Sequence, residues 1–318
     1  MARTAAARLA TVLLAVALAA CGGSAAGSHE TPAPSTVSPA TVPATTGSEA
    51  ATSTAPATDP TIDRPFEVFA PDSYDGSAAM PLVVLLHGYG ITGEMQEEFF
   101  QLQPLAESRG FLLAHPDGTI DADGSHFWNA TDACCGFGAT VDDSAYLAAV
   151  IRHIEADYRV DPARVFLVGF SNGGFMSYRM ACDHADLIAA IVSISGATFL
   201  DPAACNPSEP VTVAEIHGDN DEAIAYEGGT FRDEPHPGAQ QTVAEWAGYN
   251  GCTGPATEAT EGRDLDRRFD DAIVTQYEGC PPSGAVELWT IPHGTHIPEL
   301  SSTFSAQVID FLLAHPKQ

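Results

Sequence analysis

A short apolar run that ends on a serine between two glycines most constrains how this chain can fold. Residues 164–170 have the β-branched and aromatic content of a buried strand, and residues 173–185 have a helical pattern. The sequence Gly-Phe-Ser-Asn-Gly at residues 169–173 therefore stands at a strand-to-helix corner. Glycine permits so sharp a turn, because a Cβ on either side would clash with the neighbouring strand or helix. The corner predicts an exposed, reactive Ser171 hydroxyl; the alternative is a plain turn.

Strand-like runs alternate with helical patterns from residue 61 onward. Strands are expected within residues 66–71, 80–90, 110–118, 164–170, 187–196, 211–219, 272–279 and 285–294. Helices are expected within residues 142–160, 173–185, 239–250 and 302–316, with Asp142 or Asp143 as the cap of the first. This order predicts the α/β class: a mostly parallel twisted sheet with helices on both faces.

Polar residues collect in the loops that follow the expected strands, where ligands of an open α/β sheet bind. A serine nucleophile needs a base, and the base needs an acid that orients it. The candidate acids are Asp219 and Asp221, and the candidate bases are His293 and His296. Spacing along the chain is compatible with either member of each pair.

The N-terminus and the charge balance predict an exported protein. Residues 1–21 carry two arginines, a short apolar run and then Leu-Ala-Ala-Cys, which resembles a bacterial lipobox acylated at Cys21; an ordinary secretory signal is the alternative. Residues 22–60 are rich in Ser, Thr, Pro and Ala and are expected to be a disordered tether before a domain at 61–318. A net charge of −29 argues against nucleic acid and anionic membrane surfaces as partners, so the membrane is expected only through Cys21.

Six cysteines remain beyond Cys21, an even number that suggests disulfides in an exported chain. None forms a C-x-x-C pair, so zinc is not expected. We favour pairs between Cys252 and Cys280 and between Cys182 and Cys205. The adjacent Cys134 and Cys135 then pair with each other or cross to other partners.

Five motifs together resemble one family: LLHGYG, WNATDACCGFGATVDD, GFSNGG, HGDNDEAIAYEGG and LWTIPHGTH. Over residues 65–315 the chain is similar to the polyhydroxybutyrate depolymerase and feruloyl esterase group of α/β-hydrolases, which includes envelope lipoproteins. The resemblance implies the α/β-hydrolase fold, with Asp221 as acid and His296 as base to Ser171. It departs after His296, where Ile-Pro stands in place of the family's common tryptophan.

The chemistry of ester cleavage also requires two backbone N–H donors for the developing oxyanion. Asn172, directly after the serine, is one candidate, and Tyr89 in the His-Gly-Tyr-Gly loop is the other. We expect His87 and His217 to be structural, and Trp128 to be either a core anchor or a wall of the cleft.

These observations predict a secreted, lipid-anchored serine carboxylester hydrolase that needs no metal or organic cofactor. Its expected substrate is a polyester oligomer or an ester linked to polysaccharide. A peptidase or acyltransferase on the same three residues is the first alternative. A non-catalytic envelope binding lipoprotein is the second.

Overall fold

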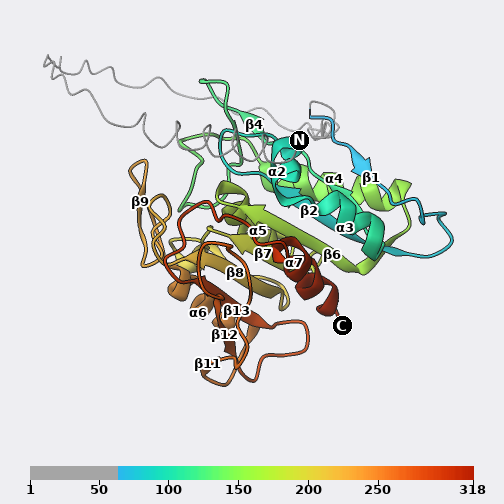
Figure 1. Ribbon diagram of the computed structural model, residues 1–318. Coiled ribbons are helices and arrows are strands. Elements are labelled where there is room, and N and C mark those ends of the chain that lie inside the picture. Colours follow the sequence, from blue (N-terminus) through green and yellow to red (C-terminus); the bar gives the residue numbers. More distant parts are fainter. Residues whose placement is uncertain (1–63) are drawn as a thin grey trace, which may run out of the picture.

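A nine-stranded sheet organises residues 64–318, the part of the chain that the computed structural model describes (Figure 1). In spatial order its strands are β1 (Val68–Phe69), β3 (Leu112–Ala114), β2 (Met80–Leu86), β6 (Val160–Phe170), β7 (Ala190–Ile194), β8 (Thr212–Gly218), β13 (Val286–Ile291), β12 (Ile273–Tyr277) and β11 (Ala256–Glu258). The strands from β3 to β13 in this order are parallel. At one edge β1 pairs antiparallel with β3, and at the other β12 pairs antiparallel with both β13 and β11. The predicted, mostly parallel sheet is confirmed.

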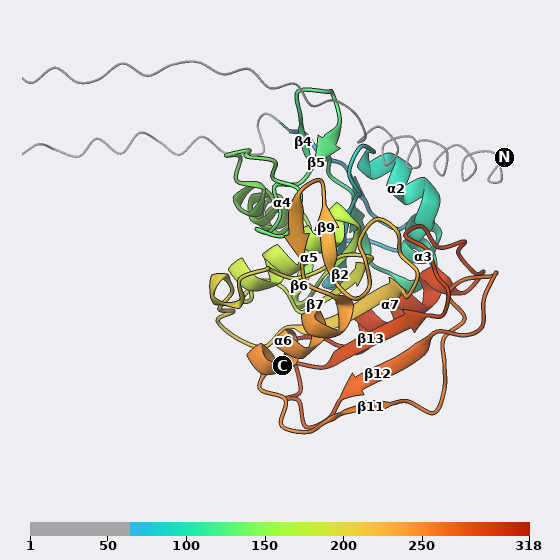
Figure 2. The same ribbon diagram turned by 90° about the vertical axis from the view of Figure 1, so that its left-hand side faces the viewer.

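Helices cover both faces of this sheet (Figure 2). They are α2 (Gly93–Phe100), α3 (Leu102–Arg109), α4 (Asp143–Asp157), α5 (Asn172–Asp183), α6 (Ala239–Asn250) and α7 (Phe304–Ala314). Side chains of β2 alternate between the two faces: Leu82 and Val84 join the core under α4, α5 and α6, whereas Val83 and Leu85 join the core under α2, α3 and α7. Such a two-sided core explains why β2 is apolar at almost every position.

Several small elements escaped prediction from the sequence. They are α2, α3, the edge strand β11, a 3₁₀ turn at Pro202–Ala204, the hairpin of β4 (Thr119–Ile120) and β5 (His126–Phe127), and the hairpin of β9 (Gly229–Phe231) and β10 (Glu234–His236). Helix α3 buries only Leu102 and Ala106, so its apolar periodicity is weak. By contrast, α4 begins as expected, because the Asp142 carboxylate accepts a hydrogen bond from the Ala145 amide.

Three disulfides cross-link the described residues. Cys182 pairs with Cys205 and Cys252 with Cys280, as favoured from the sequence, and Cys134 pairs with its neighbour Cys135. The expected signal segment 1–21 with Cys21, and the expected tether 22–60, lie outside the described residues. Over residues 64–318, no helix has the length and apolar character needed to cross a membrane.

Candidate active site

Ser171 occupies a sharp turn between β6 and α5. Its backbone lies at φ 54° and ψ −119°, a conformation that a non-glycine residue adopts only where the surroundings enforce it. A Cβ on Gly169 would lie 2.0 Å from the carbonyl oxygen of Gly173, and a Cβ on Gly173 would lie 2.2 Å from that of Leu86. The two glycines therefore let strand, turn and helix approach closely enough to present the Ser171 hydroxyl at the end of the sheet.

A hydrogen-bond chain connects Ser171 to a histidine and an aspartate from two other loops. His296, after β13, places Nε2 3.0 Å from Ser171 Oγ and Nδ1 2.8 Å from Asp221 Oδ2. Asp221 follows β8, the parallel neighbour of β13, so the sheet brings the two loops together. The Asp221 side chain is fully buried, and the His296 side chain is 12% exposed. Among the acids and bases considered from the sequence, Asp221 and His296 are therefore the two that form a hydrogen-bond chain with Ser171.

The Asp221 carboxylate is held by donors on both oxygens. Oδ1 accepts from the amides of Ala223 and Ile224, each at 2.8 Å, and Oδ2 accepts from His296. Burial opposes ionisation of this carboxyl group, but the charges and hydrogen bonds of His296 and His217 outweigh burial and lower its pKa well below the usual value. The group is therefore an anion at neutral pH.

The other members of the two candidate pairs have a different role. Asp219 Oδ1 accepts a hydrogen bond from the backbone amide of His293 at 2.6 Å, which joins the loop after β8 to the loop after β13. His293 itself is exposed and lies at φ 60°. Neither side chain hydrogen-bonds to Ser171, and the Asp219 carboxylate instead connects the two loops.

The two candidate oxyanion donors have backbone amides that are free to donate. Within residues 64–318, the N–H groups of Tyr89 and Asn172 donate no hydrogen bond to protein, as expected of oxyanion donors. The side chain of Asn172 is buried and clamps the Trp128 backbone, accepting from its amide at 2.7 Å and donating to its carbonyl at 2.9 Å. Trp128 is itself fully buried, and its indole N–H donates to the His87 carbonyl at 3.1 Å. It is a core anchor rather than a wall of the cleft.

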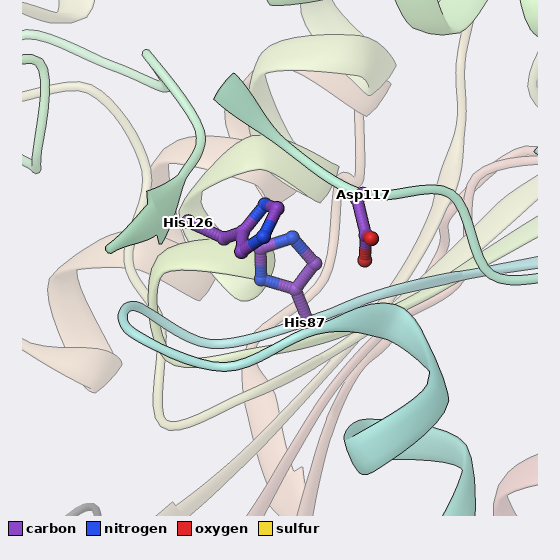
Figure 3. A group of neighbouring side chains, drawn as sticks. All are labelled: His87, Asp117 and His126. Atoms are coloured by element: carbon purple, nitrogen blue, oxygen red, sulfur yellow. The ribbon is translucent and has the colours of Figure 1, made fainter. Parts of the chain in front are cut away.

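His87, Asp117 and His126 form a cluster whose ligand atoms lie within 4.8 Å of one another, close enough to suggest a metal site (Figure 3). However, His87 Nδ1 lies 2.8 Å from the Gly88 carbonyl, and Nε2 accepts from the Gly118 amide at 2.8 Å. Burial lowers the pKa of His87 to about 4, so the ring is neutral and donates through Nδ1. With no lone pair left for an ion, His87 instead ties the Tyr89 loop to the loop after β3.

An aromatic and charged rim surrounds Tyr89. Its hydroxyl donates to Asp121 Oδ2 at 2.5 Å and accepts from Arg232 at 3.1 Å. The Arg232 guanidinium lies 4.6 Å from the centre of the Tyr89 ring and 5.3 Å from that of Phe137, which is 38% exposed. Arg232 belongs to the turn of the β9–β10 hairpin, so this unexpected hairpin reaches the candidate oxyanion loop.

A separate cavity of about 910 Å³ lies between β1, α2 and α3, and Ser171 does not line it. Its wall is acidic and includes Glu94, Glu98 and Glu107. The buried carboxylate of Glu97, also in this wall, accepts hydrogen bonds from the amides of Leu102 and Gln103. These contacts join α2 to α3. Nothing in the lining of this cavity connects it to Ser171.

A buried glutamate behind the site was missed in the sequence. Glu215 and His217 lie on β8, both almost fully buried, and His217 lies beside Asp221. His217 is a buried, hydrogen-bonded histidine as expected, but its carboxylate partner was not anticipated. The signal was present: a glutamate and a histidine two residues apart on a fully buried strand project to the same face and must satisfy each other.

Comparisons with known proteins match this chain to esterases. Residues 68–217 match the family model described as "Esterase PHB depolymerase". The chain is 30% identical over 234 residues to "Feruloyl esterase B" of Piromyces equi, a match that spans 71% of this chain and 41% of that protein. It is 32% identical over 173 residues to "Probable feruloyl esterase C" of Aspergillus clavatus, across 52% of this chain and 57% of that one.

Several solved structures have a fold similar to that of this chain. "Acetyl xylan esterase from Aspergillus awamori" superposes with a TM-score of 0.55 at 17% identity, covering 77% of this chain and 93% of the other. "Esterase PE8" superposes with a TM-score of 0.50 at 18% identity, covering 79% and 98%. The chain spans less than half the length of some curated relatives it matches, 41% of the Piromyces equi protein and 42% of "Putative esterase NocK" from Nocardia uniformis subsp. tsuyamanensis.

Proposed function

Because the chain belongs to the polyhydroxybutyrate depolymerase and feruloyl esterase group of α/β-hydrolases, we propose that it is an exported serine carboxylester hydrolase. The observation that carries this proposal is the hydrogen-bond chain from Asp221 through His296 to Ser171, with distances of 2.8 and 3.0 Å. The strained turn at Ser171 and the free backbone amides of Tyr89 and Asn172 give further support. The three disulfides fit an oxidising compartment outside the cytoplasm.

The mechanism follows from these positions. His296 Nε2 takes the proton of Ser171 Oγ as that oxygen attacks the ester carbonyl, and Asp221 stabilises the imidazolium that forms. The amides of Tyr89 and Asn172 donate to the tetrahedral oxyanion. The carbon–oxygen bond to the alcohol breaks, and the alcohol leaves with the proton from His296. Water, deprotonated by His296, then attacks the acyl-enzyme and releases the acid.

We propose esters linked to polysaccharide as the substrate class, with aromatic or acetyl acyl groups. Several relatives are named for feruloyl or acetylxylan ester hydrolysis, which supports this choice over polyester oligomers. The exposed Phe137 beside Tyr89 offers an apolar surface near the candidate oxyanion loop. Parallel assays with methyl ferulate, p-nitrophenyl acetate and hydroxybutyrate oligomers would rank the classes, and a preference for the oligomers would contradict this choice.

The activity itself is tested at Ser171. Ser171→Ala should abolish hydrolysis of p-nitrophenyl acetate and labelling by a fluorophosphonate, because no other hydroxyl stands within reach of His296 Nε2 among the described residues. The surface variant Ser108→Ala is the matched control and should retain both. Hydrolysis that persists in a folded Ser171→Ala protein would remove this serine from the mechanism.

A further inference from the structure

We propose that His217 and Glu215 are positioning residues of the catalytic group, in which a buried His217 imidazolium holds the same Asp221 oxygen that serves His296. This inference rests on the proposed function, since it concerns how Asp221 supports hydrolysis. Both residues lie two positions apart on β8, the strand labelled in Figure 1, and Asp221 follows that strand in sequence. The proposal extends the hydrogen-bond chain into the core of the sheet.

The two ring nitrogens of His217 face oxygen acceptors only. Nδ1 lies 2.9 Å from Glu215 Oε1. Nε2 lies 2.8 Å from the Ile224 carbonyl and 3.3 Å from Asp221 Oδ2. A neutral imidazole carries one N–H, so beside an ionised Glu215 its second nitrogen would point a lone pair at an oxygen. Side-chain exposures of 1% for His217 and 0% for Glu215 and Asp221 leave no room for water to intervene. We therefore assign a proton to both nitrogens and a negative charge to Glu215.

The surroundings support this charge assignment. Burial disfavours the His217 cation, but its hydrogen bonds to Asp221 and Glu215 outweigh burial and raise its pKa to about 10. Burial raises the pKa of Glu215, and the bond from His217 opposes that effect. Glu215 also accepts from the Tyr178 hydroxyl at 3.0 Å and the Gly196 amide at 3.2 Å, so its oxygens are satisfied. The pair is neutral as a whole and turns its positive end toward Asp221.

This arrangement has a consequence for His296. A cation beside Asp221 weakens the attraction of that carboxylate for a proton on His296. The other groups that face the two histidines do not cancel this effect. The Tyr226 ring lies 5.8 Å from His217, and burial lowers the pKa of nearby His236, which is neutral. The carboxylate of Glu222 accepts a hydrogen bond from the backbone amide of His296 at 3.4 Å, a contact that His217→Gln leaves in place.

The test is the pH dependence of kcat/KM in His217→Gln. Glutamine removes the cation but keeps a donor of similar size, and we expect Glu215 to take up a proton. The acid limb of the profile should move up by roughly 0.5 to 1 pH unit, because Asp221 then draws a proton to His296 more strongly. The plateau should fall about 10- to 100-fold, because the carboxylate is less well oriented.

Tyr178→Phe is the matched control. It removes a buried hydrogen bond on the far side of Glu215 while leaving His217 against Asp221. It should lower Tm without moving the acid limb, as expected of a merely structural contact. An unmoved limb in folded His217→Gln protein would overturn the proposal. The pH dependence of fluorophosphonate labelling at Ser171 gives a second measurement of the same limb.

If His217→Gln does not fold, the protonation of His217 can still be measured by NMR in the wild-type protein, without an activity assay. Long-range ¹H–¹⁵N spectra of the wild-type histidine rings should contain one ring with both nitrogens protonated at pH 8. If every ring is neutral at pH 8, the inference fails, whatever the activity. The proposed function has its own contradicting outcome: wild-type protein that shows no Ser171-dependent hydrolysis. Active wild-type protein without the imidazolium overturns this inference alone.

Discussion

At the scale of single residues, the site distinguishes groups that are only two or three positions apart. Asp221 and His296 share a hydrogen bond, whereas Asp219 holds the His293 backbone. Sequence spacing left both pairs open, and the family resemblance chose Asp221 and His296. The contacts explain the choice, because Asp221 Oδ2 lies 2.8 Å from His296 Nδ1, whereas the hydrogen bond of Asp219 goes to the backbone amide of His293.

Substitutions in each pair test this distinction. Asp221→Asn and His296→Ala should each lower kcat/KM by about 10³- to 10⁴-fold, since the three groups act as a unit. Asp219→Asn and His293→Asn should cost less than about tenfold; asparagine is chosen at position 293 because it tolerates a positive φ. Steady-state kinetics with p-nitrophenyl acetate make the comparison. Larger losses at Asp219 and His293 would reassign both roles.

At the scale of elements, the turn between β6 and α5 depends on the close approach of three backbone segments. Gly173 lies in the first turn of α5, against the carbonyl groups at the end of β2. A Cβ there would overlap the Leu86 oxygen at 2.2 Å, and backbone cannot move aside as a flexible side chain does. The packing of α5 against β2 therefore also fixes the position of Ser171.

Gly173→Ala should lower the free energy of unfolding by more than about 3 kcal/mol and displace Ser171. Gly248→Ala is the control, because Gly248 lies inside α6 and a Cβ added there would meet nothing within 4 Å. It should raise the free energy of unfolding by roughly 0.5 to 1 kcal/mol, since alanine favours the helix. Denaturant unfolding measures both. Equal stability of Gly173→Ala and wild type would contradict the close packing described for the turn.

At the scale of the whole molecule, the expected lipid anchor would hold the proposed esterase at a membrane. The short apolar segment ending in Cys21, followed by residues 22–60, predicts a domain held away from a membrane. Full-length protein should therefore appear in the membrane fraction of a lipoprotein-processing host. Cys21→Ser should lose that location and keep the specific activity of the domain. Wild-type protein free in the medium, with an N-terminus downstream of Cys21, would disprove the anchor while leaving the esterase proposal intact.

The sequence alone determined most of the sheet, the principal helices and the Ser171 turn, because these depend on local signals. Apolar periodicity defines strands and helices, and glycine permits the one turn that places a hydroxyl at the sheet's end. The α2 and α3 helices and both small hairpins lacked such signals, being short or polar.

Only the tertiary structure decided which loop side chains meet. Asp221 and His296 are 75 residues apart, and their contact depends on β8 and β13 being parallel neighbours. Likewise, Glu215 is an anomaly in an apolar strand until His217 and Tyr178 are seen around it, and Arg232 reaches Tyr89 across 143 positions. Local patterns carry no information on such distances. The directions of loop side chains follow from hydrogen bonds to distant segments, and those bonds exist only once the sheet has assembled.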